Sequence, residues 1–236
     1  MPDHIVSSFD QDLEKLRRTI AEMGGIAEKM LADSITALVR RDASLAQAVI
    51  ASDQRLDVLQ RDLEEFAILT IARRQPLAID LRETISAIRI ASDLERIGDL
   101  AKNIGKRALA VGGQFEHQKV VLGVQTMSER VSGQLKDVLD AYTTHDTQTA
   151  IGVWERDGAT DALYTSLFRE LLTYMMEDPR NITFCTHMLF CAKNVERIGD
   201  HTTNIAETIH YLVTGQTIAA DRPKNDRSTA PADAAS

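Results

Sequence analysis

A nine-residue stretch occurs twice in the chain, and this repeat is the strongest constraint on the fold. Residues 91–99 read A-S-D-L-E-R-I-G-D, and residues 192–200 read A-K-N-V-E-R-I-G-D. The second copy begins 101 positions after the first, and the match continues from Asn103-Ile104 onto Asn204-Ile205. An internal repeat of this length predicts two similar halves, each with one E-R-I-G-D helix.

The composition fits a helical bundle and argues against several other classes of protein. Hydrophobic residues make up 44% of the 236 residues and aromatic residues only 5%, and there are 12 glycines and 5 prolines. A net charge of −8 argues against a nucleic-acid partner, which would require a basic face, and is compatible with cationic ligands. No apolar run approaches the roughly 18 residues of a membrane span, so membrane association is expected only through a partner.

Two local features favour a cytoplasmic location. Cys185 and Cys191 are too few for a disulfide scaffold and lack C-x-x-C spacing, so we expect reduced thiols in the core. The N-terminus carries acidic residues and no apolar segment of the kind that a secretory signal peptide contains.

Apolar residues recur at spacings of three and four, which predicts six long helices. Their expected ends are marked by a capping box at Ser8–Gln11, caps at Asp42 and Asp146, and the breakers Pro76, Pro179 and Gly215. The helices are expected over residues 8–40, 43–73, 78–110, 121–142, 147–176 and 179–213.

No segment alternates with a period of two, so the predicted fold is all-α. It consists of two tandem antiparallel three-helix bundles joined near residues 111–118. The first bundle spans residues 1–112 and the second spans residues 113–215. Residues 216–236 contain almost no large apolar side chain and are expected to form a disordered tail.

Each repeat carries an E-x-x-x-D motif, which places two carboxylates about 5–6 Å apart on one helix face. In an antiparallel hairpin, residues equidistant from the turn lie opposite each other. Position 76 is the midpoint both of Asp57 and Glu95 and of Asp53 and Asp99. In the second half, Asp161 with Glu196 and Asp157 with Asp200 share a midpoint between positions 178 and 179. Each hairpin therefore predicts four carboxylates at one level.

Four carboxylates on helices about 8–10 Å apart repel one another unless cations bridge them. All-oxygen ligation favours Mg, Ca, Mn or iron, whereas zinc would normally require His or Cys ligands as well. The alternative is that these acids are solvated or paired with Arg96, Arg197 and their neighbours. Gly98 and Gly199 indicate either close approach of a ligand to the backbone or tight helix packing. The predicted metal ligands are Asp53, Asp57, Glu95, Asp99, Asp157, Asp161, Glu196 and Asp200.

A ferritin-like di-iron oxidase is the enzyme alternative, and it requires E-x-x-H pairs on a four-helix bundle. We find this motif only at Glu207–His210, and the first half carries Lys106 and Leu109 instead. His187 and His201 are expected to be packing or surface residues. Without a glycine-rich phosphate loop or a nucleophile–base pair, the sequence predicts no active site. A purely structural helical module is the third possibility.

Three segments of the chain are distinctive in combination. They are R-R-Q-P-L-A-I-D-L-R at residues 73–82, L-E-R-I-G-D at residues 94–99, and E-R-I-G-D-H at residues 196–201 with N-I-A-E at residues 204–207. Together they resemble the PhoU family of bacterial regulators of phosphate uptake. The resemblance covers residues 9 to about 214.

The resemblance implies a cytoplasmic, non-enzymatic negative regulator that forms a homodimer or a higher homo-oligomer. Such proteins link the ATPase subunit of the phosphate ABC transporter to a phosphate-sensing histidine kinase and keep phosphate-starvation genes off. Some members hold multinuclear metal clusters on paired E(D)-x-x-x-D motifs, which map here onto the eight acids named above. The implied ions are Mg, Mn, Fe or Zn. They would either rigidify the bundles or bridge the protein to a phosphate-bearing surface of a partner.

Overall fold

The computed structural model describes residues 2–111 and 118–219, and within these ranges all regular structure is helical. In the first half, the elements are α1 (Pro2–Arg40), α2 (Ala43–Arg74) and α3 (Ile79–Val111). The second half contains α4 (Gln118–Thr144), α5 (Thr147–Glu155), α6 (Asp157–Glu177), the short 3-10 helix η1 (Pro179–Asn181) and α7 (Ile182–Thr214).

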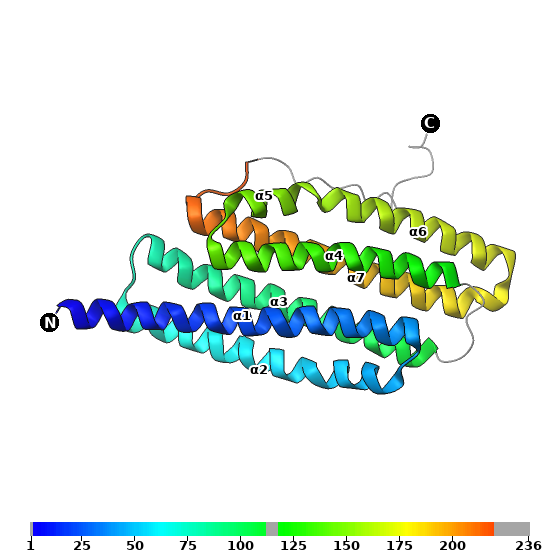
Figure 1. The fold of residues 1–236 in the computed structure, drawn as a ribbon, viewed down its shortest axis with the longest axis horizontal. Helices are drawn as coiled ribbons and strands as arrows, with labels where there is room; N and C mark the ends of the chain where they lie inside the picture. The colour runs from blue at the N-terminus through cyan, green and yellow to red at the C-terminus, as the bar shows by residue number, and fades with distance from the viewer. Residues whose placement is uncertain (1, 112–117, 220–236) are drawn as a thin grey trace.

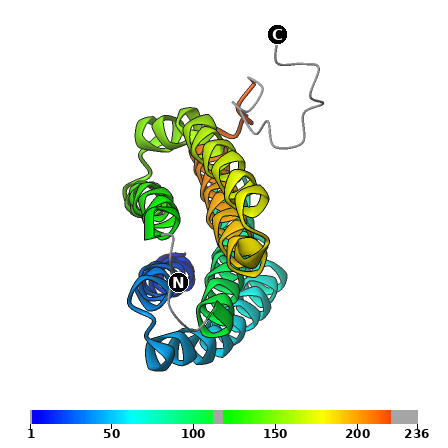
Figure 2. The ribbon, with the colours of Figure 1, turned by 90° about the vertical axis from the view of Figure 1, so that its right-hand side faces the viewer.

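The two halves stack side by side along their length (Figures 1 and 2). Helices α1, α2 and α3 pack together, and α7 packs with α4, α5 and α6. Across the two halves, α3 packs against α7 and α1 packs against α4, which leaves α2 and the α5–α6 pair on opposite outer sides. The predicted all-α fold of two antiparallel three-helix bundles is confirmed.

The sequence signals for the turns act as expected. Asp42 accepts a hydrogen bond from the Leu45 N–H at 3.0 Å, and Asp146 accepts one from the Gln148 N–H at 2.9 Å. Helix α2 ends at Arg74 because the residue before a proline disfavours the helical conformation, and Gln75 is left-handed with φ 49°. Gly215, with φ 74°, ends α7. Each half therefore begins its second helix after an aspartate cap.

Three predicted boundaries were wrong. Helix α1 begins at Pro2, so the capping box at Ser8–Gln11 does not start it; proline suits a first helical turn, where its missing N–H is not needed. The predicted fifth helix is interrupted at Arg156, whose N–H bonds to the Val153 carbonyl three residues back at 3.1 Å. Gly158, a poor helix former, follows directly. The sixth helix opens with η1 and becomes α-helical at Ile182.

Most of the predicted linker, and residues 220–236 of the predicted tail, lie outside the described residues. Residues 216–219 are described and are not helical, and Ile218 packs against the hydrophobic core. No helix in the described ranges is long and apolar enough to cross a membrane.

One continuous hydrophobic core runs through both halves. It is built mainly from Leu, Ile, Val, Ala and Met, as the low aromatic content suggests. Cys185 and Cys191 are buried and unbridged, as expected for core thiols. Burial raises the pKa of the Cys191 thiol to about 12, so this thiol stays protonated at neutral pH.

The glycines of the two E-R-I-G-D motifs have different surroundings. A Cβ atom added at Gly98 would collide with the Cδ1 atom of Leu56, which is fully buried on α2. A Cβ atom at Gly199 would meet Thr160 and Val131 methyl groups at 3.6 Å, an ordinary contact distance. Of the two interpretations from the sequence, tight helix packing accounts for Gly98.

This difference predicts opposite effects of alanine at the two positions. Gly199→Ala should raise the free energy of unfolding by up to about 1 kcal/mol, because alanine favours the helix. Gly98→Ala should lower it by about 1–3 kcal/mol, because the new methyl group forces the fully buried Leu56 side chain to shift within a packed core. Urea denaturation measures both, with the exposed Gly25→Ala as the control. Equal changes at Gly98 and Gly199 would contradict the packing interpretation.

Candidate metal centre

The eight predicted ligands lie as two groups of four, one on each hairpin. The α2–α3 cluster comprises Asp53, Asp57, Glu95 and Asp99, and the α6–α7 cluster comprises Asp157, Asp161, Glu196 and Asp200. Each cluster takes one helix, α3 or α7, from the pair whose packing joins the two halves.

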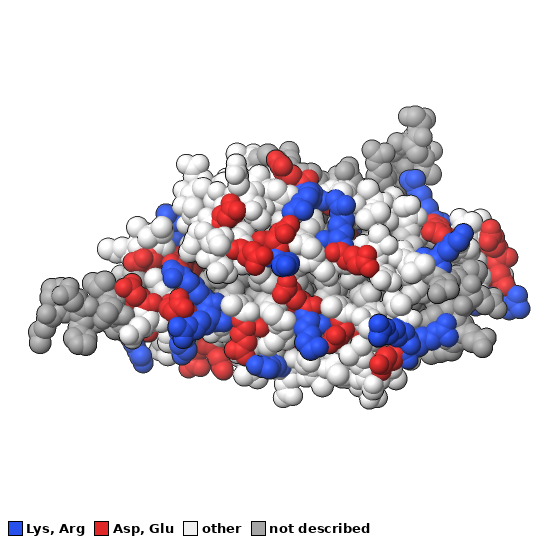
Figure 3. Space-filling view, viewed as in Figure 1, with Lys and Arg blue, Asp and Glu red and all other residues white. Residues whose placement is uncertain are grey.

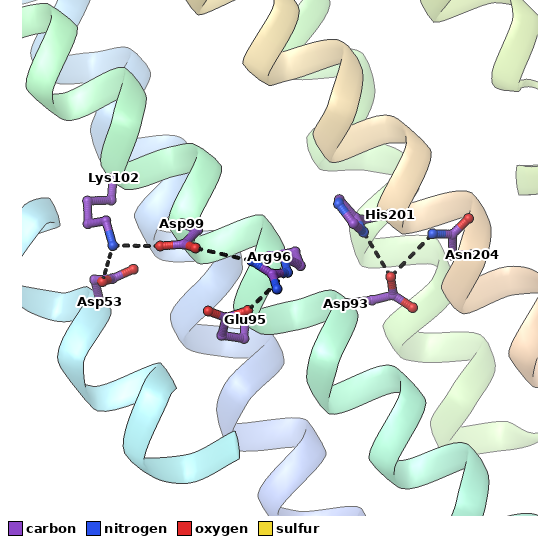
Figure 4. A network of polar contacts seen from close by, with 8 residues as sticks. All are labelled: Asp53, Asp93, Glu95, Arg96, Asp99, Lys102, His201 and Asn204. Carbon is purple, nitrogen blue, oxygen red and sulfur yellow. Dashed lines mark hydrogen bonds and ion pairs between the residues drawn. The ribbon is translucent and has the colours of Figure 1, made fainter. Parts of the chain in front are cut away.

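In the α2–α3 cluster, a lysine joins the two helices (Figure 4). Lys102 Nζ lies 2.5 Å from Asp53 Oδ2 on α2 and 2.5 Å from Asp99 Oδ1 on α3. Although burial lowers it, these two hydrogen bonds raise the pKa of Lys102 above its usual range, so the ammonium stays charged. Asp53 and Asp99 therefore face each other across the hairpin with one cation between them.

Glu95 lies beside the same group of charges. Arg96 Nε is 3.6 Å from Glu95 Oε2, and Arg96 Nη1 is 3.7 Å from Asp99 Oδ2. Burial raises the pKa of Glu95, and the negative charges of Asp99, Asp57 and Asp53 raise it further, whereas Arg96 lowers it. Glu95 thus responds to the charge of all three other acids of the cluster.

The α6–α7 cluster is more deeply buried. Asp157 and Asp161 are each 3% exposed and Glu196 is 5% exposed. The Thr203 hydroxyl donates to Asp157 Oδ1 at 2.9 Å, and Lys193 Nζ donates to Glu196 Oε1 at 2.9 Å. The second carboxylate oxygen of Glu196, Oε2, is buried and accepts no hydrogen bond from the described residues.

Burial also raises the pKa of Glu196. The hydrogen bond from Lys193 lowers this pKa, and the charges of Asp200 and Asp161 raise it again. An ionised, buried carboxylate with one oxygen lacking a partner is unfavourable, because a buried charge requires pairing. This carboxylate is the part of the cluster that a bound cation would stabilise most.

The carboxylates gather without converging on a common point. Among residues 2–111 and 118–219, no three Asp, Glu, His or Cys side chains are arranged so that they could hold one metal ion. Lysine and threonine donors occupy part of the coordinating oxygens instead. Ligation by these eight acids therefore stays a prediction, and it requires the side chains to turn toward the ion.

The sequence analysis named Arg96 as a possible partner of these acids, and Arg96 does pair with Glu95 and Asp99. It missed the lysine and threonine donors. Lys102 follows Asp99 by three positions and Lys193 precedes Glu196 by three, so helical spacing alone places each lysine beside an acid. It also missed a contact between the halves. His201 Nδ1 lies 2.8 Å from Asp93 Oδ1 on α3, and Asn204 Nδ2 donates to the same oxygen at 3.3 Å (Figure 4).

The histidines give no support to a ferritin-like centre. Glu207 Oε1 accepts a hydrogen bond from Trp154 Nε1 at 3.0 Å, and His210 Nδ1 lies 3.0 Å from the Gln216 carbonyl oxygen. Glu207 and His210 therefore have separate partners. His187 Nδ1 lies 3.4 Å from Arg107 Nη1. On the face shown in Figure 3, Lys and Arg are interspersed with Asp and Glu, without a continuous basic stripe.

Comparison with known proteins then decides the family. The PhoU domain model matches residues 20–108 and 124–209, one match in each half. The chain belongs to the PhoU family. It is 57% identical to the phosphate-specific transport system accessory protein PhoU homolog of Rhizobium meliloti, over 96% of this chain and 95% of that relative. It is 54% identical to the homolog of Caulobacter vibrioides, over 96% and 98% of the two chains.

Solved PhoU structures share its fold. The PhoU crystal structure from Pseudomonas aeruginosa has a TM-score of 0.84 and 37% identity, over 88% of this chain and 100% of that one. The phosphate transport system regulatory protein PhoU from Streptococcus pneumoniae has a TM-score of 0.81 and 28% identity, over 90% and 100%. The expected family membership is thereby confirmed.

The raised pKa of Glu196 predicts a stability change with pH in metal-free protein. The folded state holds the Glu196 proton above the ordinary pKa of 4.5, so the free energy of unfolding falls as the pH rises through the raised value. Glu196→Gln should therefore be more stable than the wild type at neutral pH. The advantage should shrink as the pH falls through the raised pKa toward 4.5, because Glu196 is then protonated in the folded state as well as in the unfolded state.

Thermal denaturation between acidic and neutral pH, with a chelator present, measures this difference. Glu155→Gln is the matched control, because Glu155 is an exposed acid in the same half. A melting temperature of Glu196→Gln that stays at or below that of the wild type throughout this range would contradict the assignment.

Proposed function

We propose that the chain is a negative regulator of phosphate uptake and of phosphate-starvation signalling, and that it acts without catalysing a reaction. The observation that carries this proposal is the match over nearly the full length, in both halves, to proteins named as accessory to the phosphate-specific transport system. In this proposal the protein acts in the cytoplasm as a homodimer or a higher homo-oligomer. It links the ATPase subunit of the phosphate ABC transporter to a phosphate-sensing histidine kinase.

The hairpin tips offer surfaces for such contacts. Leu77 is 79% exposed and Ile79 is 54% exposed at the α2–α3 turn, and Met176 is 85% exposed at the α6–α7 turn. These turns lie at opposite ends of the molecule in Figure 1. Large apolar side chains grouped on a surface are typical of protein contacts. We assign the α2–α3 tip to the transporter's ATPase subunit.

We further propose that the carboxylate clusters bind divalent or trivalent metal ions, with Mg, Mn, Fe and Zn as candidates. The donor set is all-oxygen, which suits Mg and Mn best and zinc least. Glu196 Oε2, buried without a partner, supports a cation at the α6–α7 cluster. There Asp157, Asp161, Glu196 and Asp200 would hold the ion, and its charge would offset their mutual repulsion. Because three of these acids are buried, the ion would stiffen the hairpin rather than bridge to a partner.

Metal binding should raise the thermal stability of chelator-treated protein. A ligand that binds only the folded state adds about 2.7 kcal/mol when its concentration is 100 times its dissociation constant. We expect Mn²⁺ to raise the melting temperature of the wild type and to have a much smaller effect on Asp161→Asn/Glu196→Gln. The matched control, Glu129→Gln/Glu155→Gln, removes two exposed acids from the same half and should respond as the wild type does. Equal responses of all three proteins would remove the α6–α7 cluster from the metal proposal.

The regulatory role is tested in cells. Deleting the gene should derepress phosphate-starvation genes at high phosphate, and normal repression would contradict the role. Tagged wild-type protein from cells grown at high phosphate should recover the ATPase subunit and the kinase, identified by mass spectrometry. Leu77→Ser/Ile79→Ser should lose the ATPase subunit, whereas Glu129→Gln/Glu155→Gln should retain it. Full recovery of the ATPase subunit by Leu77→Ser/Ile79→Ser would exclude the α2–α3 tip as the surface that contacts this subunit.

A further inference from the structure

A pocket between α3 and α7 is lined by positive charge and by amides. Its volume is about 370 Å³, which lies in the usual range of small-molecule sites. The described residues that line this α3–α7 pocket include no acid. They are Asn103, Lys106, Arg107 and Ala110 on α3, with Phe190 and Asn194 on α7. A chain whose net charge is −8 thus gathers two cations in one hollow.

Arg107 is held in the α3–α7 pocket by uncharged groups. Its guanidinium carbon lies 4.3 Å from the centre of the Phe190 ring, and its Nη1 lies 3.4 Å from His187 Nδ1. Burial and the charge of Arg107 lower the pKa of His187, so a neutral imidazole can accept this hydrogen bond. Within the described parts of the chain, neither Arg107 nor Lys106 is paired with a carboxylate. Both positive charges therefore remain available to an anion.

The internal repeat provides a counterpart of the α3–α7 pocket, in which the anion belongs to the chain. The repeat offset of 101 relates Asn103 to Asn204 and Asn194 to Asp93. At the counterpart, Asn204 Nδ2 donates to the carboxylate of Asp93 at 3.3 Å (Figure 4). In the α3–α7 pocket an amide, Asn194, replaces that carboxylate. The donor amide is therefore kept, whereas its acidic acceptor is lost.

Two further substitutions between the repeats change the charge in the same direction. Lys106 corresponds to Glu207, which accepts a hydrogen bond from Trp154 at 3.0 Å, and Arg107 corresponds to Thr208. Relative to its counterpart, the α3–α7 pocket has exchanged acids for an amide and a lysine, and has gained an arginine. These exchanges prepare it for an anion from solution.

We propose that the α3–α7 pocket binds a phosphate group, with Lys106 and Arg107 as its charged ligands. The amides of Asn103 and Asn194 supply further donors. A phosphate group carries about 1.5–2 negative charges at pH 7, so it matches two cations better than one carboxylate does. The forked donors of arginine fit phosphate oxygens, and lysine adds a point charge.

The pocket is larger than a single phosphate ion requires, so the group comes either from free phosphate or from a nucleotide. This inference goes beyond the proposed regulatory function and depends neither on it nor on metal at the carboxylate clusters. Calorimetry on the metal-free full chain, with inorganic phosphate and with ADP as separate titrants, distinguishes the two sources. Tighter binding of phosphate than of ADP assigns the pocket to the free ion, and the reverse order assigns it to the nucleotide.

Removing both cations should weaken binding. We expect Lys106→Gln/Arg107→Gln to lower the affinity for the preferred titrant by roughly tenfold or more, as the loss of charged hydrogen bonds implies. Arg130→Gln/Lys136→Gln is the matched control, because it removes two exposed cations from α4 and changes the net charge equally. This control should bind as the wild type does.

A second variant tests the comparison between the repeats and leaves both cations in place. Asn194→Asp installs the residue found at position 93 and hardly changes the size of the side chain. Its carboxylate should occupy the cations and lower the affinity by roughly tenfold or more. Gln148→Glu is the control, since it adds one negative charge at an exposed position on α5.

The outcomes decide this inference without affecting the regulatory function. Weaker binding in both pocket variants, with both controls unchanged, would support it. It is wrong if the wild type binds neither phosphate nor ADP, or if the pocket variants bind as tightly as the wild type. An equal loss in the controls would also overturn it, because the effect would then come from net charge. The gene-deletion test of regulation is independent of each of these results.

Discussion

Repulsion between like charges at the two hairpins is the constraint on which the central part of the structure depends. Each hairpin carries four carboxylates, and two of the eight, Glu95 and Glu196, have pKa values raised by burial and by neighbouring acids. The fold can keep such groups only if positive charge or hydrogen-bond donors balance them. Lys102 contributes to that balance in the first half, and Thr203 and Lys193 contribute to it in the second.

The internal repeat explains why the balance has to be found twice. A duplicated hairpin copies the acids, but the partners at positions 102 and 203 differ. The helices that carry the clusters also meet directly, since α3 packs against α7. Asp93, two positions before Glu95, contacts His201, the residue after Asp200. A change of charge at one cluster therefore acts on a helix that is bonded to the helix of the other cluster.

Much of the fold could be predicted from local signals. The proline after Gln75, the aspartate caps at positions 42 and 146, and the glycine at position 215 each act within a few residues, so the sequence alone locates those turns. The break at Arg156 was not predictable in the same way. The apolar stripe continues through it, and a single glycine such as Gly158 does not mark a break, since Gly98 lies inside the uninterrupted helix α3. The start of α1 was missed because a capping-box sequence inside a helix looks the same as one at the start of a helix.

The site shows a similar division. Counting from Pro76 placed Asp53 level with Asp99, and these two acids share Lys102 in the structure. The lysine was overlooked because the E-x-x-x-D motif relates only acids four positions apart, whereas Lys102 follows Asp99 by three positions. Asp93 contacts His201 and Asn204, which lie 108 and 111 positions away in the sequence. These contacts therefore depend on how the two bundles dock. No single-helix pattern carries that information.

The central claim is that cations balance the paired acids and that metal ions join the lysines in doing so. Its most direct test is a crystal structure of the full chain grown with Mn²⁺, with anomalous diffraction used to locate the metal. The account predicts a strong anomalous peak between α6 and α7, within ligating distance of Glu196. A structure without a peak at either cluster, or with manganese only at unrelated surface positions, would contradict it.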